Sequence, residues 1–137
     1  MAQTVKHLEM IQGVINRMAA NSFDLKRWSV LLASAFIAIS WRPEAMSRVA
    51  LLAPLSVLIF WCLDSYYLRQ ERMYRKLYDK VRVQEHTDYS MDTREFIQGT
   101  TISSAFFSVT LGLFYIGLIG TITAGIILLN FLSKGAN

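Results

Sequence analysis

The sequence predicts an all-α membrane protein with three transmembrane helices and a helical layer on the cytosolic side. Of its 137 residues, 53% are hydrophobic and 18% are charged, which is too apolar for an ordinary soluble domain of this size. The apolar residues gather in three segments, and an amphipathic helical pattern precedes the first segment and follows the second. A bilayer is therefore the expected solvent for much of the chain.

Residues 1–27 predict a cytosolic amphipathic helix. Its apolar residues recur at alternating spacings of three and four, with Ser22 filling one place, and form a seam that needs a partner. The seam residues are Leu8, Ile11, Ile15, Met18 and Leu25. A solitary helix lying flat on the lipid surface is the alternative, which its few basic residues disfavour. No apolar stretch typical of a cleaved secretory signal precedes residue 28, so insertion is expected to depend on internal segments.

Residues 28–68 predict a transmembrane hairpin. The first span, 28–41, is short for a bilayer, so its flanks must snorkel, while the second span, 48–68, ends in aromatic residues typical of an interface. Pro43 lies in a turn of about six residues, so the two spans return antiparallel. Lys and Arg are enriched at the outer ends of the hairpin, which places the N-terminus and the middle of the chain in the cytoplasm. Asp64, at the cytoplasmic end of the second span, is expected to pair with a Lys or Arg.

Residues 69–96 predict a cytosolic helical extension followed by a linker. The second span continues without Gly or Pro to about Arg82, and a second seam runs along it. This seam includes Tyr67, Tyr74, Leu77 and Val81. We expect the two seams to pack against each other or against copies of themselves. In the linker, Asp92 and Glu95 predict a capping box that starts a helix toward the last span.

Residues 97–137 predict an interfacial segment and the last transmembrane helix. The stretch 102–132 is apolar for 31 residues, which is longer than one upright span needs. One span over about 111–132 is favoured, and a tight hairpin turning near Gly117 or Gly120 is the alternative. Three spans place the N-terminus inside and the C-terminus outside.

Small residues of the last span predict close packing between helices of an oligomer. These residues are Gly117, Gly120, Thr121, Ala124 and Gly125. Thr123 and Asn130 lie seven residues apart on one face of the helix. Because polar groups in hydrocarbon need a partner or water, these two predict either an interhelical polar contact or a pore lining.

The basic part of the extension allows a polyanion contact. Four cations lie beyond the reach of lipid charge, about 10–25 Å below the interface: Arg75, Lys76, Lys80 and Arg82. In a ring of copies they could hold an oligonucleotide or nucleotide signal. The alternative is a solvated face that follows the positive-inside rule, which also accounts for the net charge of +4.

No enzyme, cofactor or metal site is predicted. The chain contains no nucleophile elbow, zinc-protease motif, phosphate-binding loop or dinucleotide fingerprint. His7 lies alone on a polar helix face, and His86 with its neighbouring acids matches no metal-ligand spacing. The one cysteine, Cys62, excludes a disulfide within the chain.

Three stretches carry a resemblance to known proteins: "KHLEMIQGVINRMAANSF", "FWCLDSYYLRQERMYRKLYD" and "YSMD". With them the chain resembles a family of small, largely uncharacterised bacterial inner-membrane proteins, which implies neither an activity nor a ligand. Its layout is also similar to the small transmembrane effectors of anti-phage defence systems. That likeness implies an oligomeric pore-forming or membrane-disrupting effector that is controlled through its cytosolic helices. The alternative is a non-conducting anchor or scaffold that recruits a soluble cytosolic partner.

Overall fold

The computed structural model describes residues 2–40 and 43–135, with side chains for 2–40, 52–132 and 135. The regular elements of these residues are all helical, which confirms the all-α prediction. They are α1 (Ala2–Ile39), α2 (Pro43–Val81), the 3-10 turn η1 (Arg94–Phe96), α3 (Ile102–Phe106) and α4 (Val109–Gly135).

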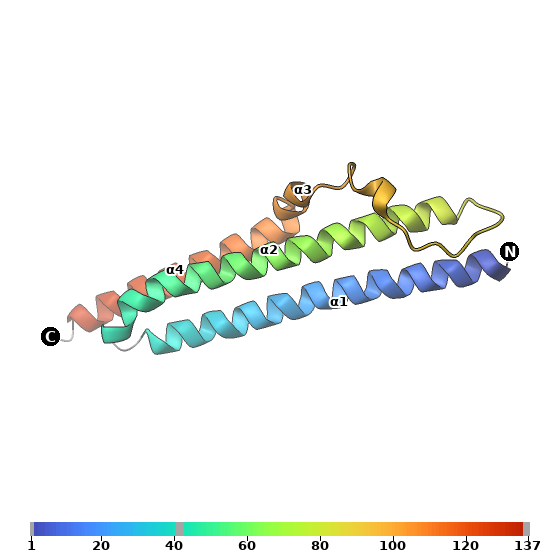
Figure 1. Ribbon diagram of the computed structural model, residues 1–137. Helices are drawn as coiled ribbons and strands as arrows, with labels where there is room; N and C mark the ends of the chain where they lie inside the picture. The colour runs from blue at the N-terminus through green and yellow to red at the C-terminus, as the bar shows by residue number, and fades with distance from the viewer. Residues whose placement is uncertain (1, 41–42, 136–137) are drawn as a thin grey trace.

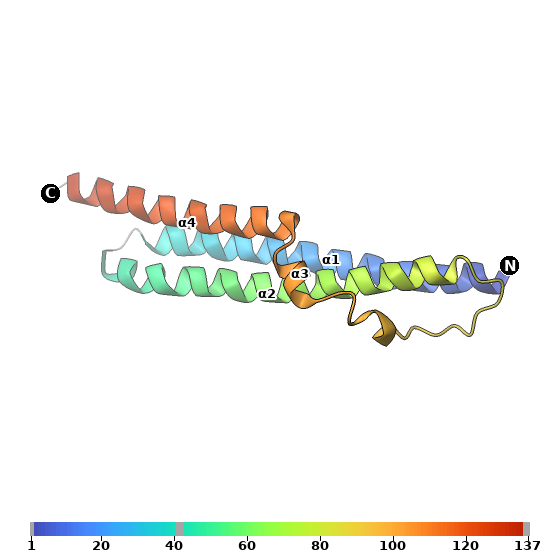
Figure 2. The ribbon, with the colours of Figure 1, turned by 90° about the horizontal axis from the view of Figure 1, so that it is seen from above.

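Two long helices form the frame of the molecule. α1 and α2 run antiparallel side by side, and α4 lies along the half of this hairpin that is nearest its turn (Figures 1 and 2). We call the three-helix part the bundle, comprising 22–39 of α1, 43–65 of α2 and α4. The remaining two-helix part, 2–21 of α1 and 66–81 of α2, is the arm. Both long helices continue from arm to bundle without a break.

The bundle has a compact core that is surrounded by apolar surface. Alanines on α1 and α2 let the helices approach closely, and Trp61, Tyr115 and neighbouring aliphatic side chains fill the centre. The Trp61 ring stacks on Phe106 with centroids 4.5 Å apart, and its Nε1 donates to the Phe106 carbonyl at 3.0 Å. The core therefore also fixes the position of α3.

α4 is one continuous helix, with no turn at Gly117 or Gly120. Its segment Val109–Leu132 is long and apolar enough to cross a membrane, and it is the one helix among the described residues that meets this criterion. Only 17% of its most apolar window is buried inside the protein, whereas the core helix of a soluble protein would be mostly buried. These properties are consistent with membrane association.

The arm has its own hydrophobic core. Ile11 and Ile15 of α1 are buried against Leu77 and Val81 of α2, and partly buried side chains surround them. These surrounding residues are Leu8, Tyr74, Tyr78, Met91 and Phe96. Six of the nine predicted seam residues thus meet in one cluster. The other three, Met18, Leu25 and Tyr67, are half-buried and lie outside it.

Residues 82–101 leave the tip of the arm and return along α2 to α3 (Figure 2). We call this segment the strap. Basic side chains on one face of α2 hold it: Arg69 Nε donates to the Thr100 carbonyl and Lys76 Nζ to the Gly99 carbonyl, both at 2.7 Å. The predicted capping box is wrong, because Asp92 accepts from the amide of Arg94 instead of capping a long helix.

Candidate functional site

A buried ion pair lies where the arm meets the bundle. The Asp64 side chain is 0% exposed, and its Oδ2 lies 2.5 Å from Lys26 Nζ of α1. Ser22 donates to the other carboxylate oxygen, and the Tyr115 hydroxyl of α4 donates to Oδ2 at 3.0 Å. We call these four residues the junction cluster. Asp64 therefore has the cationic partner that the sequence predicts, and it contacts two helices besides its own.

The electrostatics of the junction cluster explain why a charge can be buried there. A carboxylate removed from water is costly unless it is paired and hydrogen-bonded, and Asp64 has both kinds of partner. The Lys26 side chain is 23% exposed, so its ammonium group is not wholly removed from water. Lys26 Nζ also donates to Ser22 at 2.8 Å and lies 5.9 Å from the centroid of the Phe114 ring. The cluster links three helices through one carboxylate.

The pattern of Ser22 and Lys26, four residues apart on α1, is the one sequence signal for this cluster. Tyr115 gives no such signal, because an aromatic residue in an apolar span is ordinary. The contribution of α4 to the junction cluster was therefore missed.

The predicted packing residues of α4 mostly face away from the other helices of the chain. A Cβ added at Gly117 or Gly120 would meet no atom within 4 Å, while at Gly125 it would lie 3.5 Å from Ile37. Thr121 and Ala124 are exposed. The chain thus uses Gly125 for its own packing and leaves the other four available.

Thr123 and Asn130, predicted to form a polar contact or a pore lining, are both exposed. The Thr123 hydroxyl donates to the Ile119 carbonyl of its own helix at 2.8 Å. This satisfies its donor without any second helix, so the pore lining stays a prediction.

The four cations predicted to contact a polyanion each have a partner within the chain. Arg75 pairs with Glu71 of α2 at 2.7 Å, and Arg82, directly after α2, pairs with Asp79 of α2 at 3.2 Å. Lys80 pairs with Glu95 of the strap at 2.7 Å, and Lys76 donates to a strap carbonyl. These contacts account for the basic residues structurally, and an oligonucleotide contact stays a prediction.

His7 is buried under the strap, so its expected place on a solvated helix face is wrong. The residue is 1% exposed, its Nε2 donates to the Ser90 carbonyl at 3.0 Å, and its Nδ1 lies 2.5 Å from the Thr87 hydroxyl. The Tyr89 ring lies near the His7 ring, with centroids 5.6 Å apart and planes tilted by 44°, and Tyr89 has a left-handed backbone conformation (φ 58°). Thr4 donates to the Glu85 carbonyl at 3.2 Å. The strap is thus fastened to the N-terminal turns of α1.

A cavity of about 590 Å³ adjoins His7 at the tip of the arm. It is lined by both basic and acidic side chains, among them Lys80, Asp88, Asp92 and Glu95. No group of three or more His, Cys, Asp or Glu side chains in the described part of the chain is arranged to hold a metal ion.

The turn at Asp92 gives a test of the strap that depends on pH. The side-chain hydrogen bond from Arg94 lowers the pKa of Asp92 from its usual 3.8 to about 2. Because the folded pKa lies below the unfolded one, this turn is stabilised above about pH 3.8 and loses that stabilisation as pH falls through about 2. Arg94→Gln is expected to raise the Asp92 pKa toward 3.8 in an NMR titration, whereas Arg27→Gln, a distant control, should leave it unchanged. An unshifted Asp92 pKa in Arg94→Gln would contradict the contact.

Comparison with protein-family models, with curated proteins and with solved structures finds no match.

Proposed function

We propose that the protein is an oligomeric three-span protein of the bacterial inner membrane, in which a cytosolic arm controls a pore or a membrane lesion. All three bundle helices present large apolar side chains outward, which supports their placement in lipid. Leu31 of α1 is 56% exposed, Ile59 of α2 is 54% exposed and Ile116 of α4 is 62% exposed. In this placement the hairpin supplies two spans and α4 supplies the third.

The charges support an orientation with the N-terminus in the cytoplasm and the C-terminus outside. Lys26 and Arg27 of α1 and Arg69 and Arg72 of α2 all lie at the end of the bundle from which the arm leaves. The positive-inside rule assigns that end to the cytoplasm. The arm and the strap are then cytosolic.

The junction cluster is the observation that carries the proposal of control. Asp64 bonds to α1 and α4, and both long helices continue directly from it into the arm. A twist or separation of the arm helices that reaches Asp64 would change at least one of its contacts. Two arrangements of the arm would favour two arrangements of α4, which is the coupling that a signal-controlled membrane assembly needs.

Several copies are required to enclose a water path, because the three helices of one chain pack around a filled core. The outward face of α4 provides the contact between copies. Its residues Gly117, Gly120 and Ala124 leave room for another helix backbone.

Gly120→Leu is expected to weaken the oligomer by about 1 kcal/mol or more per contact, since the added side chain separates the helices. No atom of the described residues lies within 4 Å of a Cβ added there, so the fold of the single chain should persist. The measurement is the mass of the purified protein in detergent as a function of protein concentration. Gly112→Leu is a matched control, because that glycine also has open space around it. Equal masses for wild type and both variants would argue against this interface.

Flux through liposomes tests conduction directly. The reconstituted protein is expected to release a trapped small ion, and Gly120→Leu should release less at equal protein density. An oligomer of normal mass that releases nothing would refute the pore.

A non-conducting anchor is the second candidate. The cavity of about 590 Å³ at the free end of the arm favours it, because a recruited soluble protein would meet that end first. We include a role in anti-phage defence in this proposal, and the similarity of layout to the small transmembrane effectors is its sole support. Survival of phage-challenged cells with and without the gene, and with Gly120→Leu, would test that role.

A further inference from the structure

The packed core of the arm does not extend to the junction cluster. The buried residues of this core end at Ile15 on α1 and Leu77 on α2, and the ion pair of Asp64 with Lys26 lies farther along both helices. Met73 of α2 is buried but does not belong to this core. Between this core and the ion pair lies an open groove of about 590 Å³. The half-buried seam residues Met18, Tyr67 and Tyr74 line it instead of filling it.

The groove is lined for binding an anion. Its polar lining consists of Arg17, Asn21, Tyr66, Tyr67, Gln70 and Tyr74, which supply a guanidinium, two amides and three hydroxyls and contain no acid. Among the described residues, Arg17 takes part in no ion pair, whereas each cation of α2 whose side chain is described bonds to a carboxylate or to a backbone carbonyl. The cavity at the arm tip has three carboxylates in its lining, so it is less suited to an anion. An unpaired guanidinium among hydroxyls and amides suits a phosphate group.

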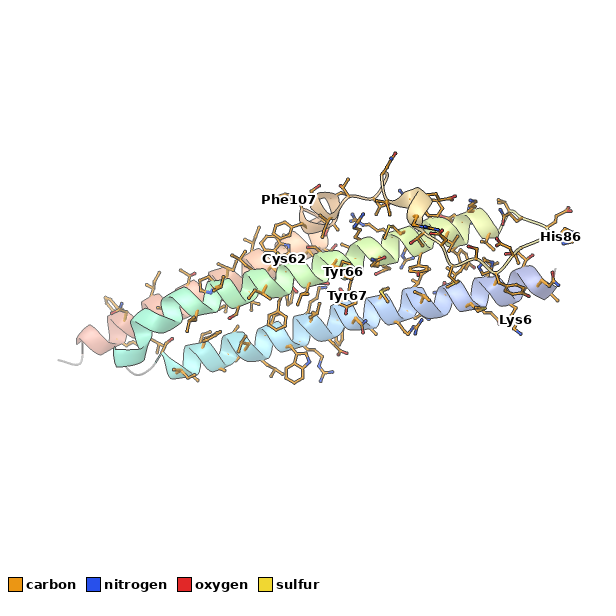
Figure 3. The ribbon with its side chains drawn as sticks, in the orientation of Figure 1. Lys6, Cys62, Tyr66, Tyr67, His86 and Phe107 are labelled. Atoms are coloured by element: carbon orange, nitrogen blue, oxygen red, sulfur yellow. The ribbon has the colours of Figure 1, made fainter. Side chains whose placement is uncertain are left out.

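The position of the groove relative to the membrane indicates which molecule would supply that phosphate. The apolar segment of α4 begins at Val109, and α3 just before it is fixed to α2 between Trp61 and Arg72. The cytosolic face of the bundle therefore lies along this part of α2. Tyr66 and Tyr67 lie within it, on the middle of α2 (Figure 3). Tyrosines at this level are typical of a membrane interface.

From Tyr67 the groove extends to Tyr74, which is about 10 Å at 1.5 Å per residue. The headgroup layer of one leaflet is about 5–8 Å thick, so the groove occupies the layer in which lipid phosphates lie. The long side chain of Arg17 can meet a phosphate there from the side of α1.

We propose that this groove binds the phosphate headgroup of an anionic phospholipid from the cytoplasmic leaflet. Arg17 contacts the phosphate, the tyrosine hydroxyls and the Asn21 and Gln70 amides donate to the headgroup, and the apolar side chains of Val14 and Met18 contact its glycerol part. The bound lipid would lie between the arm helices, directly beside the junction cluster. The lipid would thus favour one distance between the two arm helices. This inference rests on the proposed membrane placement of the bundle.

Native mass spectrometry of the protein in detergent with added dioleoylphosphatidylglycerol tests the site. Arg17→Gln should bind this lipid about ten-fold more weakly than wild type, and Tyr67→Phe should lose a smaller part of the affinity. Lys6→Gln is the matched control, since it removes an exposed cation of α1 far from the groove. Thermal unfolding of Arg17→Gln should match that of wild type, because Arg17 is exposed and holds no other described residue in an ion pair.

Two further ligands show whether the lipid binds through its phosphate and whether a soluble phosphate can replace it. Dioleoylglycerol, which lacks the phosphate, should bind no better to wild type than to Arg17→Gln, and millimolar glycerol 3-phosphate should not displace the lipid. Equal lipid binding by Arg17→Gln and Lys6→Gln would overturn the site. Displacement by glycerol 3-phosphate would overturn the lipid assignment in favour of a soluble phosphate. Membrane insertion and ion flux are measured separately, so loss of the lipid site leaves the proposed function standing.

Discussion

Replacing Lys26 by Met is expected to lower the free energy of unfolding by about 3–5 kcal/mol, because it leaves the buried Asp64 carboxylate without its counter-charge. Met preserves most of the length and apolar volume of the Lys side chain, so packing changes little. Thermal or denaturant unfolding of the detergent-solubilised protein measures the loss. The remaining hydrogen bonds from Ser22 and Tyr115 offset only part of it.

Two controls make this test specific to the ion pair. Lys26→Met combined with Asp64→Leu should recover most of the lost stability, because neither charge remains buried. Arg27→Gln removes a neighbouring cation whose pair with Asp24 is exposed, and should change stability by less than about 1 kcal/mol. If Lys26→Met costs no more than Arg27→Gln, the junction cluster does not hold the helices together.

Replacing Ile15 by Asp is the second change with a large expected effect. It places a carboxylate in the arm core without a partner, which should cost at least about 3 kcal/mol and separate the arm helices. Hydrogen exchange of the arm amides measures this directly, since opened helices lose protection. Leu77→Asp should act in the same way from α2.

The controls for the arm are exposed residues of the same helix. Lys6→Ala and Gln12→Ala should leave amide protection within error, because both side chains face solvent. Similar exchange in Ile15→Asp and in these controls would mean that the arm helices do not pack against each other.

The sequence predicted the arm because its core residues repeat at helical spacing on two segments of similar length. Ile11 and Ile15 on α1 meet Leu77 and Val81 on α2, and the two segments lie on either side of a hairpin. The continuation of the second span as a helix was also predictable, because that stretch contains neither Gly nor Pro, and α2 ends at Val81, one residue before the predicted end.

The strap was not predictable, because it is held mainly through backbone carbonyls. Arg69 and Lys76 bond to the carbonyls of Thr100 and Gly99, and a carbonyl leaves no signal in a sequence. His7 was misplaced for the same reason, since the backbone of Ser90 is one of its partners. In the sequence, the basic residues of α2 indicate topology or a ligand site, although several of them hold the strap.

The most direct test of the account is the side of the membrane on which each part of the chain lies. In a Cys62→Ala background, Gln12→Cys reports on the arm and Gly135→Cys reports on the end of α4. In intact cells, a membrane-impermeant maleimide reacts only with a cysteine on the outer side of the inner membrane. If the bundle spans the membrane three times, Gly135→Cys is labelled in intact cells, whereas Gln12→Cys is labelled only after the inner membrane is permeabilised. Labelling of both positions from the same side would contradict three spans with a cytosolic arm.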